Sequence, residues 1–280
     1  MKNFVVINDK KKMKEPGKFL LKNKYYKSYT LFLANEKKIN ILDTLVLTSE
    51  NSIDVLENYI ADDFDIPIML RMDYDNLSNA KYIGGIPLFT LEALKESCFF
   101  LFKNGYIPVL QPYVERFENT CNLNCSISNN TNDLFIELTG KGFDAGDLRL
   151  GLVEPHEKIM YDYLNWEILS RDIISHDNYL ITKKYREMYI TKLESYIKYV
   201  NNKFRLLENI SDLKENYNII LNEKYVPISK ETIEETAFLA YQIKNSIIPL
   251  LPYSHDYILS FSILKEQYVL WDIYGKWYYR

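Results

Sequence analysis

The feature that most constrains the fold is the regular alternation of short apolar segments with clusters of turn-forming residues. Asn129 to Asn132 and Lys265 to Gln267 have the composition and length of hairpin turns. The segments on either side of them are rich in β-branched and aromatic residues, which favour strands. The same reasoning predicts strands at 39–48, 66–74, 107–114, 122–128, 133–139, 257–264 and 268–274.

Helices are predicted between these strands, where apolar residues recur at helical spacing behind a capping residue. They cover 52–59, 90–103 and a segment that opens at Ser229, while the charged stretch of about 156–222 is also predicted to be helical. Pro16 to Lys18 is predicted to be a turn, and the prolines of 107–114 indicate an edge strand or a hinge. The order of elements predicts an α/β protein of the α+β class.

Composition excludes several classes of protein and partner. The 280 residues are 47% hydrophobic and 26% charged, which is typical of a folded domain with a large core. A net charge of −4 makes nucleic acid a poor partner, since phosphate binding needs clustered Lys and Arg. Three cysteines are too few for a disulfide framework. No run of about 18 apolar residues predicts a membrane span, so we expect a cytoplasmic protein with no membrane partner.

Arg71 is the first candidate functional residue, because it interrupts an apolar strand. One interpretation is a structural ion pair with Asp73 or Asp75. The other is a phosphate-binding residue, since a guanidinium offers a rigid fork of donors to a polyphosphate. The backbone of the nearby Gly84–Gly85 turn would then bind the same anion.

Two further segments suggest ligand contacts. Gln111 lies next to Pro112, and Pro108 precedes it by three residues, so its backbone is a candidate to hydrogen-bond the edge of a base. The alternative is an ordinary edge strand. The glycine-punctuated segment from Gly140 to Gly151 does not have the spacing of a P-loop. It is either a mobile loop beside a ligand or a long connection.

The order of these motifs resembles the ATP-grasp nucleotide-binding domain of phosphoenolpyruvate synthase and pyruvate phosphate dikinase. Met69-Leu70-Arg71-Met72-Asp73 stands at the V-R-S-S segment, and Tyr82-Ile83-Gly84-Gly85-Ile86 is similar to the loop that follows it. Val109-Leu110-Gln111-Pro112-Tyr113-Val114 resembles the V-Q-x-M-V hinge. Ile136-Glu137-Leu138-Thr139-Gly140-Lys141-Gly142 resembles the I-E-A-x-x-G-x-G strand and loop, and Leu270-Trp271-Asp272-Ile273 the final metal-binding strand.

The resemblance implies two α+β lobes with a nucleotide cleft between them. The lobes would be 1–108 and 109–280, with a helical insertion at about 156–222. ATP and Mg²⁺ are the implied cofactors, and Arg71 and Asp272 the catalytic residues. The implied cofactor-binding residues are Lys18, Arg71, Gly84, Gly85, Gln111 and Glu137, and the metal ligands Asp272 and Glu137.

The departures from the family leave two functions open. Met72 and Asp73 replace two serines, and Ile258 or Ser260 replaces a carboxylate on the strand before the last. Asp272 is then the main metal ligand, and Glu137 or Asp256 is a candidate to compensate for that loss. One hypothesis is an ATP-dependent phosphotransferase or ligase, with a partner protein as a candidate source of the acceptor. The other is a degenerate module that binds nucleotide or a partner without catalysis, and an unrelated α/β protein remains a third alternative.

Overall fold

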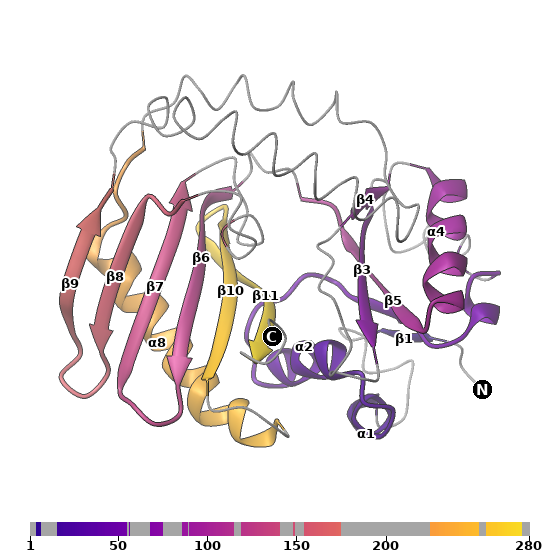
Figure 1. The fold of residues 1–280 in the computed structure, drawn as a ribbon, viewed down its shortest axis with the longest axis horizontal. Helices are drawn as coiled ribbons and strands as arrows, with labels where there is room; N and C mark the ends of the chain where they lie inside the picture. The colour runs from indigo at the N-terminus through magenta and orange to yellow at the C-terminus, as the bar shows by residue number, and fades with distance from the viewer. Residues whose placement is uncertain are drawn as a thin grey trace. The chain divides into compact units, whose positions relative to one another are not determined.

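The computed structural model contains two compact units, each built on an antiparallel sheet (Figure 1). The structure describes residues 4–6, 16–54, 56, 68–74, 86–88, 90–114, 119–140, 148, 154–174, 225–251 and 256–275. Described residues up to Val114 belong to unit 1, and those from 119 to 275 belong to unit 2. The α+β class expected from the sequence is confirmed.

Unit 1 has a five-stranded sheet with the order β1-β2-β5-β3-β4, in which all neighbours are antiparallel. β5 therefore lies in the middle of the sheet, and its pairing with β3 extends from Tyr106 to Pro112. The prediction of an edge strand at 107–114 is wrong, because the prolines are accommodated within a paired strand. The strands are β1 (Phe4–Val6), β2 (Leu45–Leu47), β3 (Ile68–Tyr74), β4 (Ile86–Leu88) and β5 (Tyr106–Pro112).

The helices of unit 1 begin where the sequence supplies the right first residue. α4 (Leu91–Lys103) begins after Thr90, whose hydroxyl accepts a hydrogen bond from the Ala93 backbone at 3.2 Å. Pro16 opens α1 (Pro16–Lys22), so the predicted turn at 16–18 is instead the first turn of a helix. α2 (Tyr26–Glu36) follows, and a short 3₁₀ helix, η1, covers Glu50–Ser52.

Unit 2 has a six-stranded antiparallel sheet with the order β11-β10-β6-β7-β8-β9. The two predicted hairpins, β6–β7 and β10–β11, are both present. Lys265 and Glu266, which connect β10 to β11, have the positive φ angles of a tight hairpin turn. The strands are β6 (Asn119–Ser128), β7 (Asp133–Gly140), β8 (Glu157–Asp162), β9 (Glu167–Ile173), β10 (Asp256–Leu264) and β11 (Gln267–Gly275).

One face of this sheet is apolar and lies under α8 (Lys230–Ser246), which a 3₁₀ turn, η3 (Ile248–Leu250), follows (Figure 1). α8 begins after Ser229, as predicted, and buries Ile233, Ala237 and Ala240. Burial of these side chains and of the apolar residues of the sheet stabilises the unit by about 25 cal/mol for each Å² of apolar surface removed from water. The sheet residues are Leu123, Cys125, Ile136, Leu138, Ile159, Leu259 and Phe261.

The helical prediction for 156–222 is wrong in its first part. Glu157, Ile159 and Tyr161 are buried in alternation with the more exposed Lys158 and Met160, which is the period of a strand. The charges that suggested a solvated helix lie on the faces of β8 and β9. Residues 175–222 lie outside the described part of the chain. The predicted lobe boundary between 108 and 109 falls inside β5, so the 1–108 and 109–280 lobes remain a prediction.

Candidate functional site

Arg71 belongs to a buried polar chain on one face of the unit 1 sheet. Its Nη1 donates to Oε1 of Gln111 at 3.1 Å, and Nε2 of Gln111 donates to Oγ1 of Thr44 at 2.9 Å. Arg71 is 6% exposed, and the other two residues are fully buried. The three residues come from β3, from β5 and from the segment before β2, and the register places them on the same face. The sequence singled out Arg71 and Gln111 separately, and the structure brings them together.

Asp73 caps α2 from a distant point in the sequence. Its Oδ2 accepts a hydrogen bond from the backbone of Ser28 at 2.7 Å, and Asp73 is 2% exposed. Ser28 lies in the first turn of α2, where backbone N–H groups have no partner within the helix and a negative charge is favourable. This contact gives Asp73 a structural role. It differs from the ion pair with Arg71 that was one interpretation of the sequence.

The other expected phosphate contacts of unit 1 are Lys18 and the Gly84–Gly85 turn. Lys18 lies exposed on α1. Gly84 and Gly85 lie outside the described residues. Next to Lys18, Gly17 packs so closely on Phe32 of α2 that a Cβ atom at position 17 would overlap the aromatic ring.

In unit 2, a polar row crosses five strands on the face opposite α8. Register places Asp272 opposite Ser260, Ser260 opposite Asn124, Asn124 opposite Glu137, and Glu137 opposite Lys158. Residues that lie directly opposite one another point to the same side of an antiparallel sheet. The predicted residues Asp272 and Glu137 therefore share a face, and Ser260, not Ile258, stands opposite Asp272.

The central part of this face is buried and internally hydrogen-bonded. Oγ of Ser260 donates to Oδ1 of Asn124 at 2.7 Å, and Oγ of Ser262 donates to Oδ1 of Asn122. Nε1 of Trp271 donates to the hydroxyl oxygen of Ser262. These four Ser and Asn side chains are at most 4% exposed. Burying polar groups costs free energy unless they are hydrogen-bonded. This face therefore carries hydrogen-bonded polar side chains at positions where apolar side chains would have no such cost.

Asp272 lies at the end of the polar row, on the edge strand β11, and is 1% exposed. The hairpin of 257–274 predicts a central strand for Asp272, whereas β11 is at the edge among the described strands. Oδ1 of Asp272 accepts a hydrogen bond from the backbone of Ile273 at 3.0 Å. Glu137, three strands away, is about 14 Å distant at a strand spacing of about 4.8 Å.

The donor set tests whether this face fits a hard cation such as Mg²⁺. Carboxylate and hydroxyl oxygens are ligands that suit Mg²⁺, and Asp272 and Ser260 offer both in directly opposite positions, while Oδ1 of Asn124, one strand further, accepts the hydrogen bond from Ser260. Glu137 is too far from Asp272 to share one ion with it. Within the described ranges, no group of three His, Cys, Asp or Glu side chains lies close enough to hold a metal. Among the described residues, an ion on this face would therefore have Asp272 as its one carboxylate ligand.

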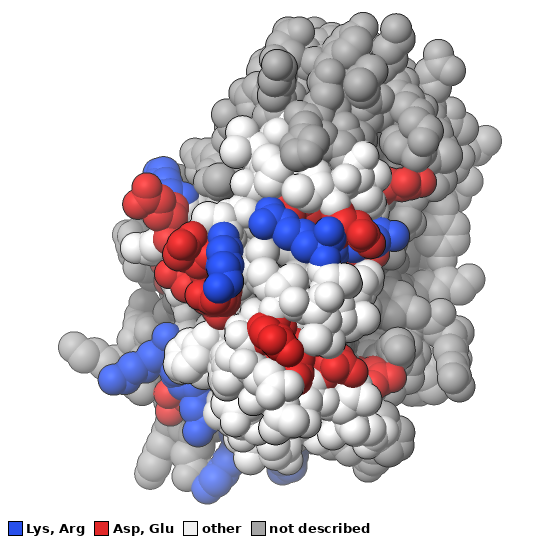
Figure 2. Space-filling view, turned by 90° about the vertical axis from the view of Figure 1, so that its left-hand side faces the viewer, with Lys and Arg blue, Asp and Glu red and all other residues white. Residues whose placement is uncertain are grey.

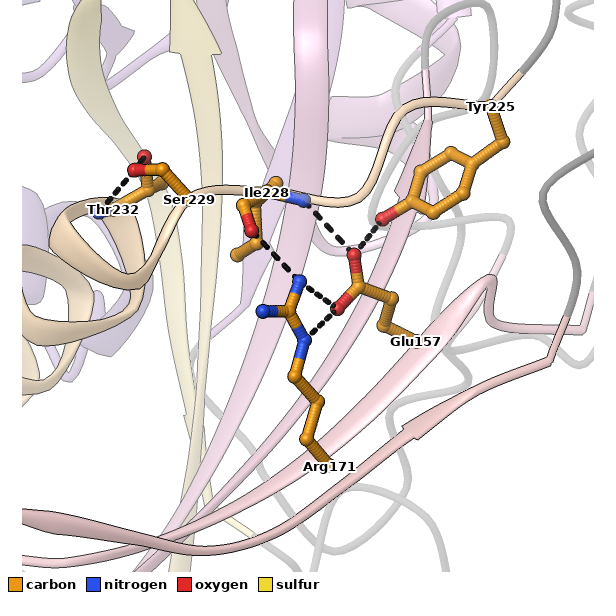
Figure 3. Close-up of polar contacts among 6 residues, drawn as sticks. All are labelled: Glu157, Arg171, Tyr225, Ile228, Ser229 and Thr232. Carbon is orange, nitrogen blue, oxygen red and sulfur yellow. Dashed lines mark hydrogen bonds and ion pairs between the residues drawn. The ribbon is translucent and has the colours of Figure 1, made fainter.

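A second polar cluster, which sequence reasoning did not find, surrounds Glu157 on the α8 side of the sheet (Figure 3). Arg171 of β9 donates through Nε to Oε2 of Glu157 at 2.7 Å. Oε1 accepts from the Tyr225 hydroxyl and, at 2.9 Å, from the Ile228 backbone. Nη2 of Arg171 also donates to the Ile228 carbonyl at 2.7 Å.

The Glu157 cluster fixes the segment that leads into α8. Glu157 is fully buried, and a buried carboxylate requires this number of partners. Tyr225 also stacks against His156, with ring centroids 4.5 Å apart. The alternation of Glu157, Ile159 and Tyr161 was the available signal for a strand, but nothing local indicates Tyr225, 68 residues away.

The three cysteines lie in the apolar interior. Cys98, Cys121 and Cys125 are free thiols with at most 1% exposure. Burial raises the pKa of the Cys121 thiol to about 12, and the charge of Glu157 adds to the effect. Such thiols are unreactive in the folded protein.

No family model matches the sequence, and no curated protein matches it. Solved structures similar to the chain include a D-alanine-D-alanine ligase from Helicobacter pylori, with 11% identity and a TM-score of 0.44. Its alignment covers 91% of this chain and 54% of the ligase. The macrocyclase MdnC from Microcystis aeruginosa MRC, bound with the precursor peptide MdnA, gives 10% identity, 90% and 53% coverage, and a TM-score of 0.40. This chain thus spans about half the length of these structures. No helix among the described residues is long and apolar enough to cross a membrane.

Proposed function

We propose that this chain is an ATP-grasp-type protein that binds ATP with Mg²⁺ and acts as a phosphotransferase or a ligase. The observation that carries the proposal is the buried polar row of unit 2, in which Asp272, Ser260 and Asn124 present oxygen ligands on one face of an antiparallel sheet. The family resemblance, which rests on the order of the sequence motifs, expects a metal-binding strand at this position.

Asp272 is the proposed metal ligand, with Ser260 and Asn124 beside it. An Mg²⁺ ion held by Asp272 would supply charge that orients the terminal phosphate and offsets its negative charge. Glu137, because of its distance from Asp272, is proposed as a contact to another part of the nucleotide and not as a second ligand of the same ion.

In unit 1, the proposed phosphate contacts are Arg71, Lys18 and the backbone of Gly84 and Gly85. The hydrogen bond that Arg71 donates to Gln111 holds its guanidinium in one orientation, and a preoriented cation loses less entropy when it binds an anion. Gln111 uses its side chain for this bond, so the proposed contact with adenine falls to its backbone. Arg71 and Asp272 are the proposed catalytic residues, since phosphoryl transfer depends on position and charge stabilisation.

The second candidate function is a module that binds nucleotide or a protein partner without catalysis. Among the described residues, no second carboxylate lies near Asp272, which favours this module, because Ser260 stands where the family has an acidic residue. The acceptor in the catalytic hypothesis would be a histidine on another protein, a carboxylate or a small alcohol.

Thermal unfolding with a panel of nucleotides tests the proposal. ATP with Mg²⁺ at ~100 times its dissociation constant should stabilise the fold by about 2.7 kcal/mol, and GTP by less. Arg71→Lys should weaken ATP binding more than adenosine binding, because lysine keeps the charge but loses the bidentate fork. Equal shifts for all nucleotides, or none, would contradict the proposal. If the protein turns over ATP and Asp272→Asn abolishes that turnover, the protein is an enzyme and not a binding module.

A further inference from the structure

The described surface of unit 2 carries charges of both signs. Figure 2 faces the side on which β9 lies in Figure 1, and Lys and Arg groups border an uncharged area there together with Asp and Glu groups. A surface of mixed charge favours neither a basic nor an acidic partner. The buried polar chain of unit 1 is different, because its end groups allow only one arrangement.

The polar chain that begins at Arg71 has one possible direction of hydrogen bonding. A guanidinium only donates, so the amide of Gln111 must turn its oxygen Oε1 toward Arg71. The amide nitrogen Nε2 then points to Thr44, whose Oγ1 accepts at 2.9 Å. The Thr44 hydroxyl in turn donates to the backbone carbonyl of Leu42 at 2.8 Å, and a carbonyl only accepts. Both ends of the chain therefore require the same direction.

Sheet register and burial hold this chain in place. Thr44 directly precedes β2, and the β2–β5 pairing begins at the residues next to Thr44 and Gln111. Arg71 stands opposite Val109, two residues from Gln111, and such diagonal neighbours are within reach of long side chains. Thr44 and Gln111 are fully buried, so solvent does not replace a lost partner. The Thr44 hydroxyl is thus the acceptor that keeps the Gln111 amide, and with it Oε1, facing Arg71.

We propose that Thr44 is a positioning residue for phosphate binding, which acts through Gln111 and holds the guanidinium of Arg71 in the orientation that meets the anion. This role rests on the proposed function, in which Arg71 contacts the phosphates of ATP. A guanidinium that is already oriented loses less conformational freedom when it binds a phosphate. Removal of the Thr44 hydroxyl should therefore weaken the binding of a ligand with phosphates and not of one without them.

Titration calorimetry of the full chain with ATP and with adenosine, both in the presence of Mg²⁺, tests this role. Thr44→Val keeps the size of the side chain and removes the hydroxyl. It should weaken ATP binding by roughly tenfold, the effect of about one lost hydrogen bond, and leave adenosine binding unchanged. Thr44→Ser keeps the hydroxyl and should bind ATP within about twofold of the wild type.

Thr30→Val is the matched control, because it removes the same group from a similarly buried site of unit 1. Thr30 is 3% exposed in α2, and its Oγ1 donates to the Lys27 carbonyl at 2.7 Å. This bond does not belong to the chain that begins at Arg71. Thr30→Val should therefore lower stability in denaturant unfolding but keep the wild-type affinity for ATP. An equal loss of ATP affinity in Thr30→Val and Thr44→Val would assign the effect to stability and contradict the role of Thr44.

A double variant shows whether Thr44 acts through Gln111. Gln111→Met removes the amide and should weaken ATP binding, and Thr44→Val added to it should cause no further loss. The double variant also keeps the test valid if Thr44→Val alone does not fold. It leaves no buried Gln111 amide without its acceptor, and removal of both partners of a hydrogen bond costs less than removal of one.

The side-chain amide protons of Gln111 give a readout that does not need nucleotide. The proton that Gln111 donates to Thr44 should exchange slowly with deuterium, because both residues are fully buried. In NMR spectra, Thr44→Val should accelerate this exchange by roughly tenfold, while Thr44→Ser and Thr30→Val should leave it as in the wild type.

The outcomes separate a failure of this role from a failure of the proposed function. If the wild type binds no ATP, or binds it no better than adenosine, the proposed function is wrong and the phosphate role of Thr44 fails with it. If the wild type binds ATP and Thr44→Val binds it equally well, the role of Thr44 alone is wrong. A further loss of affinity when Thr44→Val is added to Gln111→Met would show that Thr44 does not act through Gln111. Unchanged exchange of the Gln111 protons in Thr44→Val would overturn the hydrogen-bonded chain itself.

Discussion

Asp272 combines near-complete burial with a position at the end of a polar row. An ionised carboxylate in such a place needs compensation by hydrogen bonds or by a cation. Asp272→Asn preserves the size of the side chain and removes its charge. If Asp272 binds Mg²⁺, the variant should fold normally and lose the Mg²⁺ dependence of ATP binding, as measured by titration calorimetry with and without the metal.

The matched control for this substitution is Asp162→Asn. Asp162 lies at the β8–β9 turn of the same unit, where it accepts a hydrogen bond from Leu164 at 2.8 Å. Its replacement should not change Mg²⁺ dependence. If Asp272→Asn binds ATP with unaltered metal dependence, Asp272 is not the ligand, and the non-catalytic module becomes the better hypothesis.

The hydroxyl of Tyr225 is one of the groups through which stability responds to alkaline pH. Burial, the hydrogen bond to Glu157 and the nearby negative charge raise its pKa well above the usual value of about 10. The folded protein thus keeps its proton, while the unfolded chain releases it near pH 10. Stability from this group is therefore fully present below about pH 10 and is lost as the pH rises above it.

Chemical denaturation at a series of alkaline pH values measures this effect. The free energy of unfolding should decline above about pH 10 for the wild type. Tyr225→Phe should lower stability at neutral pH, since Glu157 loses a partner, but its decline at high pH should be shallower. The same slope in both proteins would show that Tyr225 does not control the alkaline response.

At the scale of elements, α1 and α2 depend on the absence of a side chain at Gly17. A Cβ atom there would overlap the ring of Phe32, so Gly17→Ala must displace the ring or separate the helices. We expect a loss of about 1–3 kcal/mol in denaturant unfolding, which is typical of overpacking. Lys18→Ala, one residue further, alters an exposed side chain and should cost about 0.5 kcal/mol or less.

A compensating substitution distinguishes overpacking from a change in helix propensity. Phe32→Leu removes the ring that Gly17→Ala would displace, so the double variant should be more stable than the sum of the two single effects predicts. Additive effects would contradict the close contact. Because alanine favours a helix more than glycine does, a stabilised Gly17→Ala variant would also contradict it.

Local sequence patterns predicted α4, α8 and the two hairpins of unit 2, because their signals lie within a few residues, but they did not predict α2, β1 or β4. Thr90 and Ser229 cap α4 and α8 as expected, and the Lys265–Glu266 turn closes the β10–β11 hairpin. The patterns were less informative for β8 and β9. Their charged residues suggested a solvated helix. The partners that neutralise Glu157 lie on β9 and before α8, so the local pattern does not reveal that this charge is buried.

The position of a strand in its sheet was not predictable from the same patterns. Proline in β5 suggested an edge, and β5 lies between β2 and β3. The hairpin ending in β11 suggested a central strand for Asp272, and β11 is an edge. Strand order depends on contacts between distant segments, which a single sequence does not reveal. The family resemblance implied that Asp272 and Glu137 lie together, and the register puts them on one face, but their separation is set by the two strands between them.

At the scale of the whole molecule, the buried cysteines report on each unit separately. Cys98 lies in α4 of unit 1, while Cys121 and Cys125 lie in β6 of unit 2. Each is buried, so a thiol reagent reaches it only when the surrounding structure opens. Labelling rates at the three positions, measured by mass spectrometry under native conditions, thus give the opening of each unit.

The proposed nucleotide contacts include Arg71 in unit 1 and Asp272 in unit 2, so ATP with Mg²⁺ should protect cysteines in both. A ligand that binds only the closed form slows labelling by the factor 1 + [L]/Kd, which is about 100 when its concentration is 100 times Kd. We expect a similar slowing at Cys98 and at Cys121, and a weaker effect with GTP. Slowing at Cys98 alone would limit nucleotide binding to unit 1. Slowing at Cys121 and Cys125 alone would limit it to unit 2 and leave Arg71 as a structural residue held by Gln111.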